Sequence, residues 1–139
     1  MKRQKQLTSY AIVIATVVAL LSISIASAAP SPFMGFWRSV DIDGSNQTLL
    51  ITPGPGSSYR LFLFDRGASV CGLDPSGNPL YAAIARGRGA ISGMTLEGNF
   101  NVWCLSKPTT FWGSSGFVFT YNPGSDTLTD TFGVIWNRH

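Results

Sequence analysis

The chain of 139 residues is 45% hydrophobic and 12% aromatic, and it carries a formal net charge of +3. Three of its ten basic residues lie within the first five positions, and the segment from residue 29 onward has seven basic and seven acidic side chains. The basic character therefore belongs to the N-terminus. Residues 29–139 carry no net charge, and this excludes the electrostatic attraction to nucleic acid that a basic domain would have.

The first 28 residues have the organisation of a secretory signal peptide. A basic start precedes an apolar run from Ala11 to Ile25, and Ala26-Ser27-Ala28 forms a small-x-small cleavage motif. The apolar run has about 15 residues, which is short for a membrane span of about 20. We expect cleavage after Ala28, which leaves residues 29–139 as an extracellular or periplasmic domain. A retained signal anchor is the alternative.

Cys71 and Cys104 are the two cysteines of the chain. In an exported protein, such a pair is expected to form a disulfide. This disulfide would close a loop of about 34 residues. Closing such a loop stabilises the fold by roughly 3.8 kcal/mol, because it lowers the entropy of the unfolded chain. A zinc site would need further ligands, and the single histidine, His139, is the last residue. We therefore expect a disulfide, no metal and no cofactor.

Clusters of Gly, Pro, Asn and Asp separate segments that are rich in β-branched and aromatic residues. This spacing is typical of an all-β sandwich or barrel. The predicted strands are residues 35–42, 47–52, 59–66, 80–89, 94–105, 111–121 and 126–138. Because the connections are short and sequential, we expect a single antiparallel meander of about seven to eight strands, closed or curled into a small barrel.

Alternation along each strand predicts which side chains face the core. It places Leu49 and Ile51 inside in the second strand, and Leu96, Phe100 and Cys104 inside in the fifth. In the first strand it sends Trp37 outward, unless a bulge intervenes. The inward residues of the first strand are then Phe36, Val40 and Ile42.

Asp130 lies on an otherwise apolar face of the last predicted strand. A buried carboxylate should be paired. Arg138 lies on the same strand, and Arg38 becomes a second candidate if the two ends of the sheet meet. We expect Asp130 to contact one of these arginines.

Gly35-Phe36-Trp37 begins the first predicted strand, and Trp136 and Arg138 end the last one. In these residues the chain resembles the lipocalin-type β-barrels (the calycin group), which have a G-x-W motif in the first strand. In that group an arginine often packs over the first-strand tryptophan, so the resemblance implies a cation–π contact between Arg138 and Trp37. Small secreted barrels that inhibit metalloproteases are also similar in size, in the G-x-W motif and in a single disulfide.

The chain shows no catalytic arrangement. The single histidine is terminal and both cysteines are expected to be oxidised, so neither a Ser/His/Asp nor a Cys/His arrangement has a general base. Asp41 and Asp43 are expected to cap a hairpin turn. Their segment resembles a calcium loop, but Asn46 stands where an EF-hand requires glycine, and Thr52 stands where it requires glutamate. We expect a protein that is not an enzyme and holds no metal.

Trp103, Phe111 and Trp112 flank the loop between the fifth and sixth predicted strands. Clustered aromatic residues at a barrel mouth commonly hold apolar ligands, although a domain of this size also needs aromatic residues for its core. We take these three residues and Trp37 as the candidate ligand-binding residues.

The sequence therefore predicts an exported, monomeric binding protein that holds a small apolar ligand or a partner surface at one barrel mouth. It predicts no nucleic-acid partner and, after signal cleavage, no membrane association. The alternative is a secreted protein-interaction or protease-inhibitor-like module with a solid core. A lumen packed by phenylalanines would favour that alternative; the candidates are Phe62, Phe100, Phe117 and Phe132.

Overall fold

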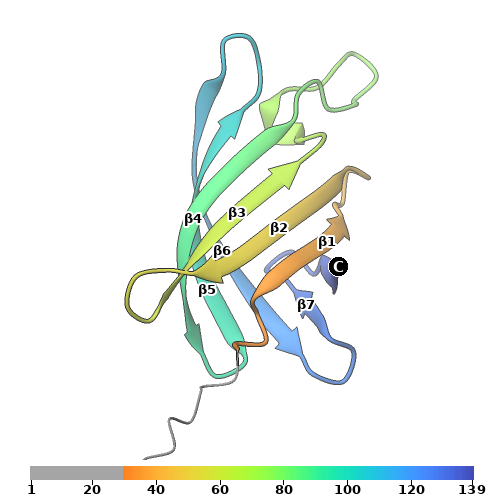
Figure 1. Cartoon of the computed structure of the whole chain (residues 1–139). Coiled ribbons are helices and arrows are strands. Elements are labelled where there is room, and N and C mark those ends of the chain that lie inside the picture. Colours follow the sequence, from red (N-terminus) through yellow and green to blue (C-terminus); the bar gives the residue numbers. More distant parts are fainter. Residues whose placement is uncertain (1–29) are drawn as a thin grey trace, which may run out of the picture. The chain divides into compact units, whose positions relative to one another are not determined.

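The computed structural model describes residues 30–139, and the predicted signal peptide lies outside the described residues. Eight strands follow one another in an antiparallel meander that closes into a barrel (Figure 1). The strands are β1 (Gly35–Val40), β2 (Asn46–Pro53), β3 (Ser58–Asp65), β4 (Ala83–Ser92), β5 (Thr95–Cys104), β6 (Thr110–Asn122), β7 (Thr127–Thr129) and β8 (Ile135–Arg138). The predicted all-β barrel is confirmed. No helix in the described part of the chain is long and apolar enough to cross a membrane.

The last predicted strand is divided into β7 and β8 by a turn that begins at Asp130. The backbone N–H of Asp130 donates to the carbonyl of Val134 at 3.0 Å, and that of Gly133 donates back to Asp130 at 3.0 Å. Gly133 has a φ of +81°, a conformation that glycine adopts without strain. The sequence did not reveal this turn, because Phe132 has the apolar character of a strand residue. In the structure Phe132 lies in the turn and is exposed.

The side chains of β1 alternate in the opposite phase to the prediction. Trp37 is fully buried and Ser39 is also buried, whereas Phe36, Val40 and Ile42 are exposed. The indole N–H of Trp37 donates to the carbonyl of Phe33 at 2.8 Å, so the ring can be buried without losing a hydrogen bond. The predicted inward set was therefore wrong by one residue, which reverses every side chain of a strand.

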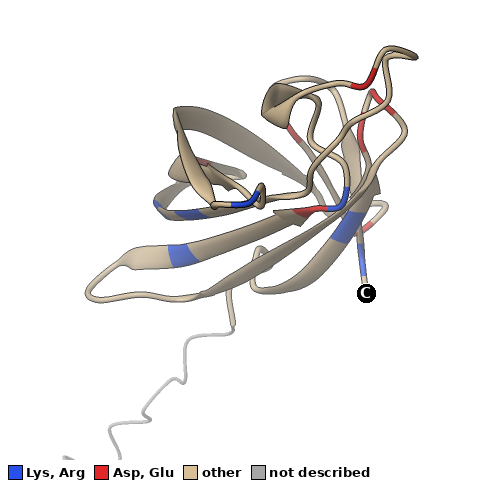
Figure 2. Cartoon of the chain, turned by 90° about the horizontal axis from the view of Figure 1, so that it is seen from above, with Lys and Arg blue, Asp and Glu red and all other residues tan. Residues whose placement is uncertain are grey.

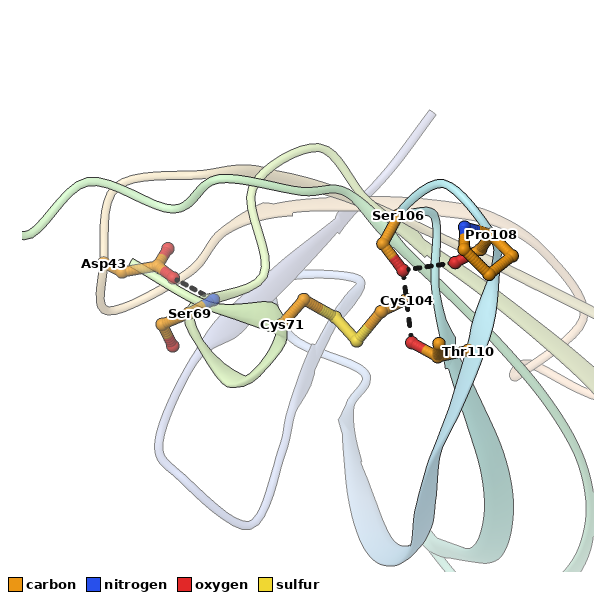
Figure 3. The surroundings of a disulfide bond; sticks show 7 residues. All are labelled: Asp43, Ser69, Cys71, Cys104, Ser106, Pro108 and Thr110. Atoms are coloured by element: carbon orange, nitrogen blue, oxygen red, sulfur yellow. Dashed lines mark hydrogen bonds between the residues drawn. A yellow bond between two sulfur atoms is a disulfide. The ribbon is translucent and has the colours of Figure 1, made fainter. Parts of the chain in front are cut away.

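Elsewhere alternation gives the observed core. Leu49 on β2 is fully buried, as predicted, and Leu96, Phe100 and Cys104 on β5 are all buried. The predicted disulfide between Cys71 and Cys104 is confirmed. It ties the short 3₁₀ helix η1 (Ser69–Cys71), which lies in the long β3–β4 connection, to the end of β5 (Figure 3).

Aromatic side chains fill the barrel at the end where β1 begins. We call Phe33, Trp37, Phe119, Tyr121 and Trp136 the aromatic plug. Tyr121 contacts the rings of Phe33 and Trp37, with centroids 5.8 and 6.5 Å away, and the Phe119 and Trp136 rings meet edge-on at 6.0 Å. The plug residues other than Tyr121 are fully buried. Each aromatic residue brings a large apolar area into the core, so the plug closes this end of the barrel.

Asp130 finds its partners within its own turn and not among the arginines. Its carboxylate accepts the backbone N–H groups of Phe132 and Val134 at 2.9 and 3.0 Å, and the indole N–H of Trp136 at 3.0 Å. The predicted contact with Arg38 or Arg138 is therefore wrong. Three neutral donors lie within six residues of Asp130 along the chain, and together they satisfy the buried carboxylate.

The seam that closes the barrel is narrow. Strands β1 and β8 share two paired positions, Trp37 opposite Arg138 and Arg38 opposite Asn137. One further backbone hydrogen bond joins the N–H of His139 to the carbonyl of Phe36 at 3.0 Å. So short a ladder needs support from side chains.

Arg138 supplies this support. Its guanidinium carbon lies 4.1 Å from the centroid of the Trp37 ring, which is the contact that the lipocalin resemblance implied. The guanidinium donates to the carbonyls of Met34 and Pro32 and pairs with Asp126 through a 2.7 Å contact from Nε. The hydrogen bond from Arg138 is the main reason that the pKa of Asp126 lies below its ordinary value. One side chain thus joins β8, β1, the segment before β1 and the β6–β7 turn.

We predict that Arg138→Ala lowers the free energy of unfolding by about 2 kcal/mol, because it removes the cation–π contact and the hydrogen bonds to two carbonyls. Arg138→Lys should recover little, since an ammonium group cannot reproduce the planar fork. Urea denaturation would measure both effects. Arg88→Ala, on the exposed face of β4, is the matched control and should change stability by less than about 0.5 kcal/mol. Equal losses for Arg138→Ala and Arg88→Ala would contradict the role of Arg138.

Candidate binding cavity at the barrel mouth

The end of the barrel opposite the aromatic plug is hollow. A cavity of about 480 Å³ lies there, and we call it the mouth cavity. It is lined by residues from the β1–β2 turn, the ends of β3 and β5, the start of β4, part of β6, η1 and the β7–β8 turn. A volume of this size is typical of small-molecule pockets in proteins.

The cavity exists because the inward residues at the mouth are small. In one row across the sheet, Leu63 of β3 faces Ala85 of β4, Ala85 faces Val102 of β5, and Val102 faces Gly113 of β6. All but Gly113 are buried residues of the apolar core. Between Leu63 and Gly113 this row has no aromatic side chain, and Leu63, Ala85 and Val102 all line the cavity.

Nearer the plug, the lumen is filled because large side chains lie over glycines. A Cβ atom added to Gly98 would lie 2.4 Å from Cδ1 of Leu61, and one added to Gly89 would lie 2.9 Å from Cδ1 of Leu96. Both distances are too short for a real contact. The glycines of β4 and β5 thus make room for the two leucines, and the barrel is solid at this level.

Aromatic residues form part of the cavity wall. Phe117 of β6, Phe132 of the β7–β8 turn and Trp112 of β6 all line it. Trp112 is the extra residue of a β-bulge, because Trp103 pairs with Phe111 while Val102 pairs with Gly113. A bulge redirects a side chain relative to its strand, and here the bulged tryptophan reaches the mouth. Its side chain remains 48% exposed.

The four predicted binding residues are separated by the fold. Trp112 lines the mouth cavity. Trp103 and Phe111 pack against each other on the strand pair β5–β6, with ring centroids 5.6 Å apart, and they are not among the lining residues. Trp37 belongs to the plug. Of the four phenylalanines considered for a solid core, Phe100 is buried, Phe117 and Phe132 line the cavity, and Phe62 is partly exposed. These phenylalanines leave the mouth cavity open.

Four carboxylates also line the mouth cavity: Asp41, Asp43, Asp65 and Asp130. Among the described residues that line the cavity, none is Lys, Arg or His. Figure 2 shows acidic positions on loops and strand ends and several basic positions along the strands. The sequence pattern predicted a turn at Asp41 and Asp43, and none of the four carboxylates was among the predicted binding residues.

The mouth carboxylates are held by neutral donors. Asp65, which is 5% exposed, accepts the Ser45 hydroxyl at 2.7 Å, the Gly67 N–H at 3.0 Å and the Gln47 amide at 3.2 Å. Asp130, which is 8% exposed, has the three N–H partners of its own turn. These hydrogen bonds fix both carboxylates in position without neutralising their charge.

The two carboxylates of the β1–β2 turn differ in proton affinity. Desolvation is the largest cause that raises the pKa of Asp41, and repulsion from Asp43, Asp65 and Asp130 adds to it, against one hydrogen bond from the N–H of Ile42. Desolvation also acts on Asp43, but hydrogen bonds from Ser45 and Ser69 outweigh it and hold the pKa of Asp43 below its ordinary value (Figure 3). Asp41 is therefore the carboxylate whose pKa reflects its acidic neighbours.

The carboxylates do not converge on a point. Among residues 30–139, no group of three or more His, Cys, Asp or Glu side chains is arranged to hold a metal ion. No protein-family model, curated protein or solved structure matches this chain. The proposed function therefore rests on the geometry of the mouth cavity.

Removing the charge of Asp41 should not destabilise the protein at neutral pH. Because the pKa of Asp41 is raised, the folded state binds its proton more tightly than the unfolded state, and that advantage is lost as pH rises through the folded pKa. We therefore expect Asp41→Asn to melt at the same or a higher temperature than the wild type at pH 7. The difference should shrink toward about pH 3, where the aspartate itself is largely protonated.

Asp43→Asn is the matched variant, and it should have the opposite effect on thermal stability. The lowered pKa of Asp43 means that its ionised form stabilises the fold above the ordinary aspartate pKa, and this contribution is lost as pH falls. We expect Asp43→Asn to melt at a lower temperature than the wild type at pH 7. Thermal unfolding of both variants between pH 3 and pH 7 measures the two trends, and a marked loss for Asp41→Asn at pH 7 would contradict this electrostatic interpretation.

Proposed function

We propose that this chain is an exported binding protein of the lipocalin-like type that holds a small molecule with an apolar body in the mouth cavity. The observation that carries this proposal is the half-filled barrel, which is solid at the plug and hollow over about 480 Å³ at the mouth. The walls of the cavity include Leu63, Ala85, Val102 and Phe117, which offer apolar surface for a ligand to cover. Burial of that surface would supply the affinity.

The cavity is prearranged, which favours binding. Its walls are strands of a closed barrel, and the disulfide holds η1, whose residues Ser69 and Val70 take part in the lining. A ligand entering such a site orders few side chains or loops, so little affinity is lost to entropy. Both the disulfide and the predicted signal peptide support export.

A protein-interaction module is the second candidate, and one observation favours it. Phe111 is 58% exposed and packs against Trp103, and Leu105 beyond the end of β5 is also exposed. Exposed aromatic side chains are common at interfaces. This group lies outside the lining of the mouth cavity, so variants can separate the two functions.

The first test fills the cavity. We expect the mature chain to bind the uncharged fluorophore N-phenyl-1-naphthylamine saturably at one site, and Ala85→Leu to weaken this binding at least about tenfold because the added side chain occupies the lumen. Ala90→Leu is the control, since it makes the same change on the exposed face of β4. Fluorescence titration measures all three proteins, and thermal unfolding verifies that each is folded.

Two outcomes would contradict the proposal. One is the absence of saturable binding by the wild type. The other is equal affinity for the wild type and Ala85→Leu, which would place the fluorophore outside the cavity.

A further inference from the structure

The charges of this domain are segregated. Of the seven acidic residues in positions 30–139, four line the mouth cavity, whereas none of the seven basic residues does. Three of the basic residues, Arg60, Arg86 and Arg88, lie together on β3 and β4 and line a separate shallow groove. A domain with no net charge thus has one opening whose charged groups are all negative.

The protein itself does not compensate this charge. Within residues 30–139 the structure has one salt bridge, between Arg138 and Asp126, and it involves none of the mouth carboxylates. Asp65 and Asp130 are more than nine-tenths buried and have only N–H and O–H donors of neutral groups as partners. These donors satisfy the hydrogen-bonding capacity of the two carboxylates but add no positive charge, so a cationic ligand at the opening would be attracted to them.

The raised pKa of Asp41 also supports a cationic ligand. Its carboxylate is disfavoured by partial burial and by the three neighbouring carboxylates, which is why its pKa is raised. A bound cation would reverse this effect and favour the ionised form. Residues that serve binding often cost stability in the free protein, and Asp41 fits that description.

The lining suits an organic cation better than a metal ion. Its four carboxylates come from the β1–β2 turn, the end of β3 and the β7–β8 turn, and they form no metal-ligating cluster in the described chain. The lining also includes the rings of Trp112, Phe117 and Phe132 and an aliphatic part with Leu63 and Val102. The faces of aromatic rings attract cations. An ammonium group on an apolar body would use both kinds of surface at once.

We propose that the mouth cavity selects small organic cations, in which a protonated amine faces the carboxylates and an apolar body contacts the aromatic and aliphatic wall. This inference rests on the proposed function, because it assigns the charge of the ligand that the cavity holds. The cavity, with its volume and apolar wall, is the site. The carboxylates determine which ligands it prefers.

The test compares three molecules that share an indole body and differ in the end group: tryptamine, tryptophol and indole-3-propionate. Isothermal titration calorimetry of the mature chain at pH 7 should give an affinity for cationic tryptamine at least about tenfold above that for neutral tryptophol, since charge-assisted hydrogen bonds are the stronger ones. Indole-3-propionate should bind most weakly. Added salt should weaken tryptamine binding and leave tryptophol binding almost unchanged.

Variants locate the effect. Asp41→Asn should lower tryptamine affinity by about threefold or more while tryptophol affinity stays constant, because one attractive charge is lost. Asp43→Asn should act in the same way and serves as a second variant at the same opening. Glu97→Gln is the matched control, since Glu97 is exposed on β5 and is absent from the cavity lining. It should change neither affinity.

The outcomes separate this inference from the proposed function. If tryptophol or indole-3-propionate binds as tightly as tryptamine, or if Glu97→Gln lowers tryptamine affinity as much as Asp41→Asn, the charge selectivity is overturned while the cavity remains a binding site. If tryptamine does not bind but N-phenyl-1-naphthylamine does, the inference fails and the proposed function stands. If no probe binds, both fail.

Discussion

The unequal filling of the barrel is the constraint on which the rest of the structure depends. Close packing leaves few voids inside proteins, so a lumen that is solid at one end and open at the other reflects the sizes of particular side chains. At the plug, bulky rings and leucines lie over glycines such as Gly98. At the mouth, the inward positions of β4 are Ala83 and Ala85, and both line the cavity. The plug supplies the apolar burial that stabilises the fold, which allows the mouth to stay hollow.

The barrel stays closed although its final seam is short. Arg138 lies over Trp37, a residue of the aromatic plug that is far from Arg138 along the chain. This contact holds the first and last strands together at the level where the core is most densely packed. The second closure, between Cys71 and Cys104, holds the β3–β4 connection at the opposite end. Each end of the barrel is thus secured by one long-range interaction, and the hollow half is supported by the covalent one.

The sequence was sufficient to predict the meander, its closure, the disulfide and the inward faces of β2 and β5, because these follow from turn residues, cysteine number and simple alternation. It was misleading for β1, where the inward residue is the tryptophan with a local carbonyl partner and not the more numerous aliphatic residues. It was also misleading for Asp130, since a turn that supplies three neutral donors cannot be distinguished by composition from a strand that needs an arginine.

The acidic lining was missed for a different reason. Asp41 and Asp43 do belong to a turn, as expected, but in an up-and-down meander the β1–β2, β3–β4, β5–β6 and β7–β8 connections all lie at one end of the barrel. That rule places Asp65, at the end of β3, beside the β1–β2 turn, and it could have been applied to the sequence. Asp130 reaches the same end only through the β7–β8 turn, which the predicted strand 126–138 did not contain. The bulge that brings Trp112 to the cavity has no comparable signal, because it depends on the register between β5 and β6.

A ligand bound as proposed occupies the hollow half of the barrel and leaves the plug unchanged. Methyl-resolved NMR during titration with tryptamine can detect this, because methyl groups are present at both levels of the lumen. We predict shifts for the mouth methyls of Leu63, Ala85 and Val102, with those of Leu96 and Leu128 at the plug level unaffected. Shifts confined to the plug level or to the outer face of the sheet, with the mouth methyls unmoved, would contradict the account.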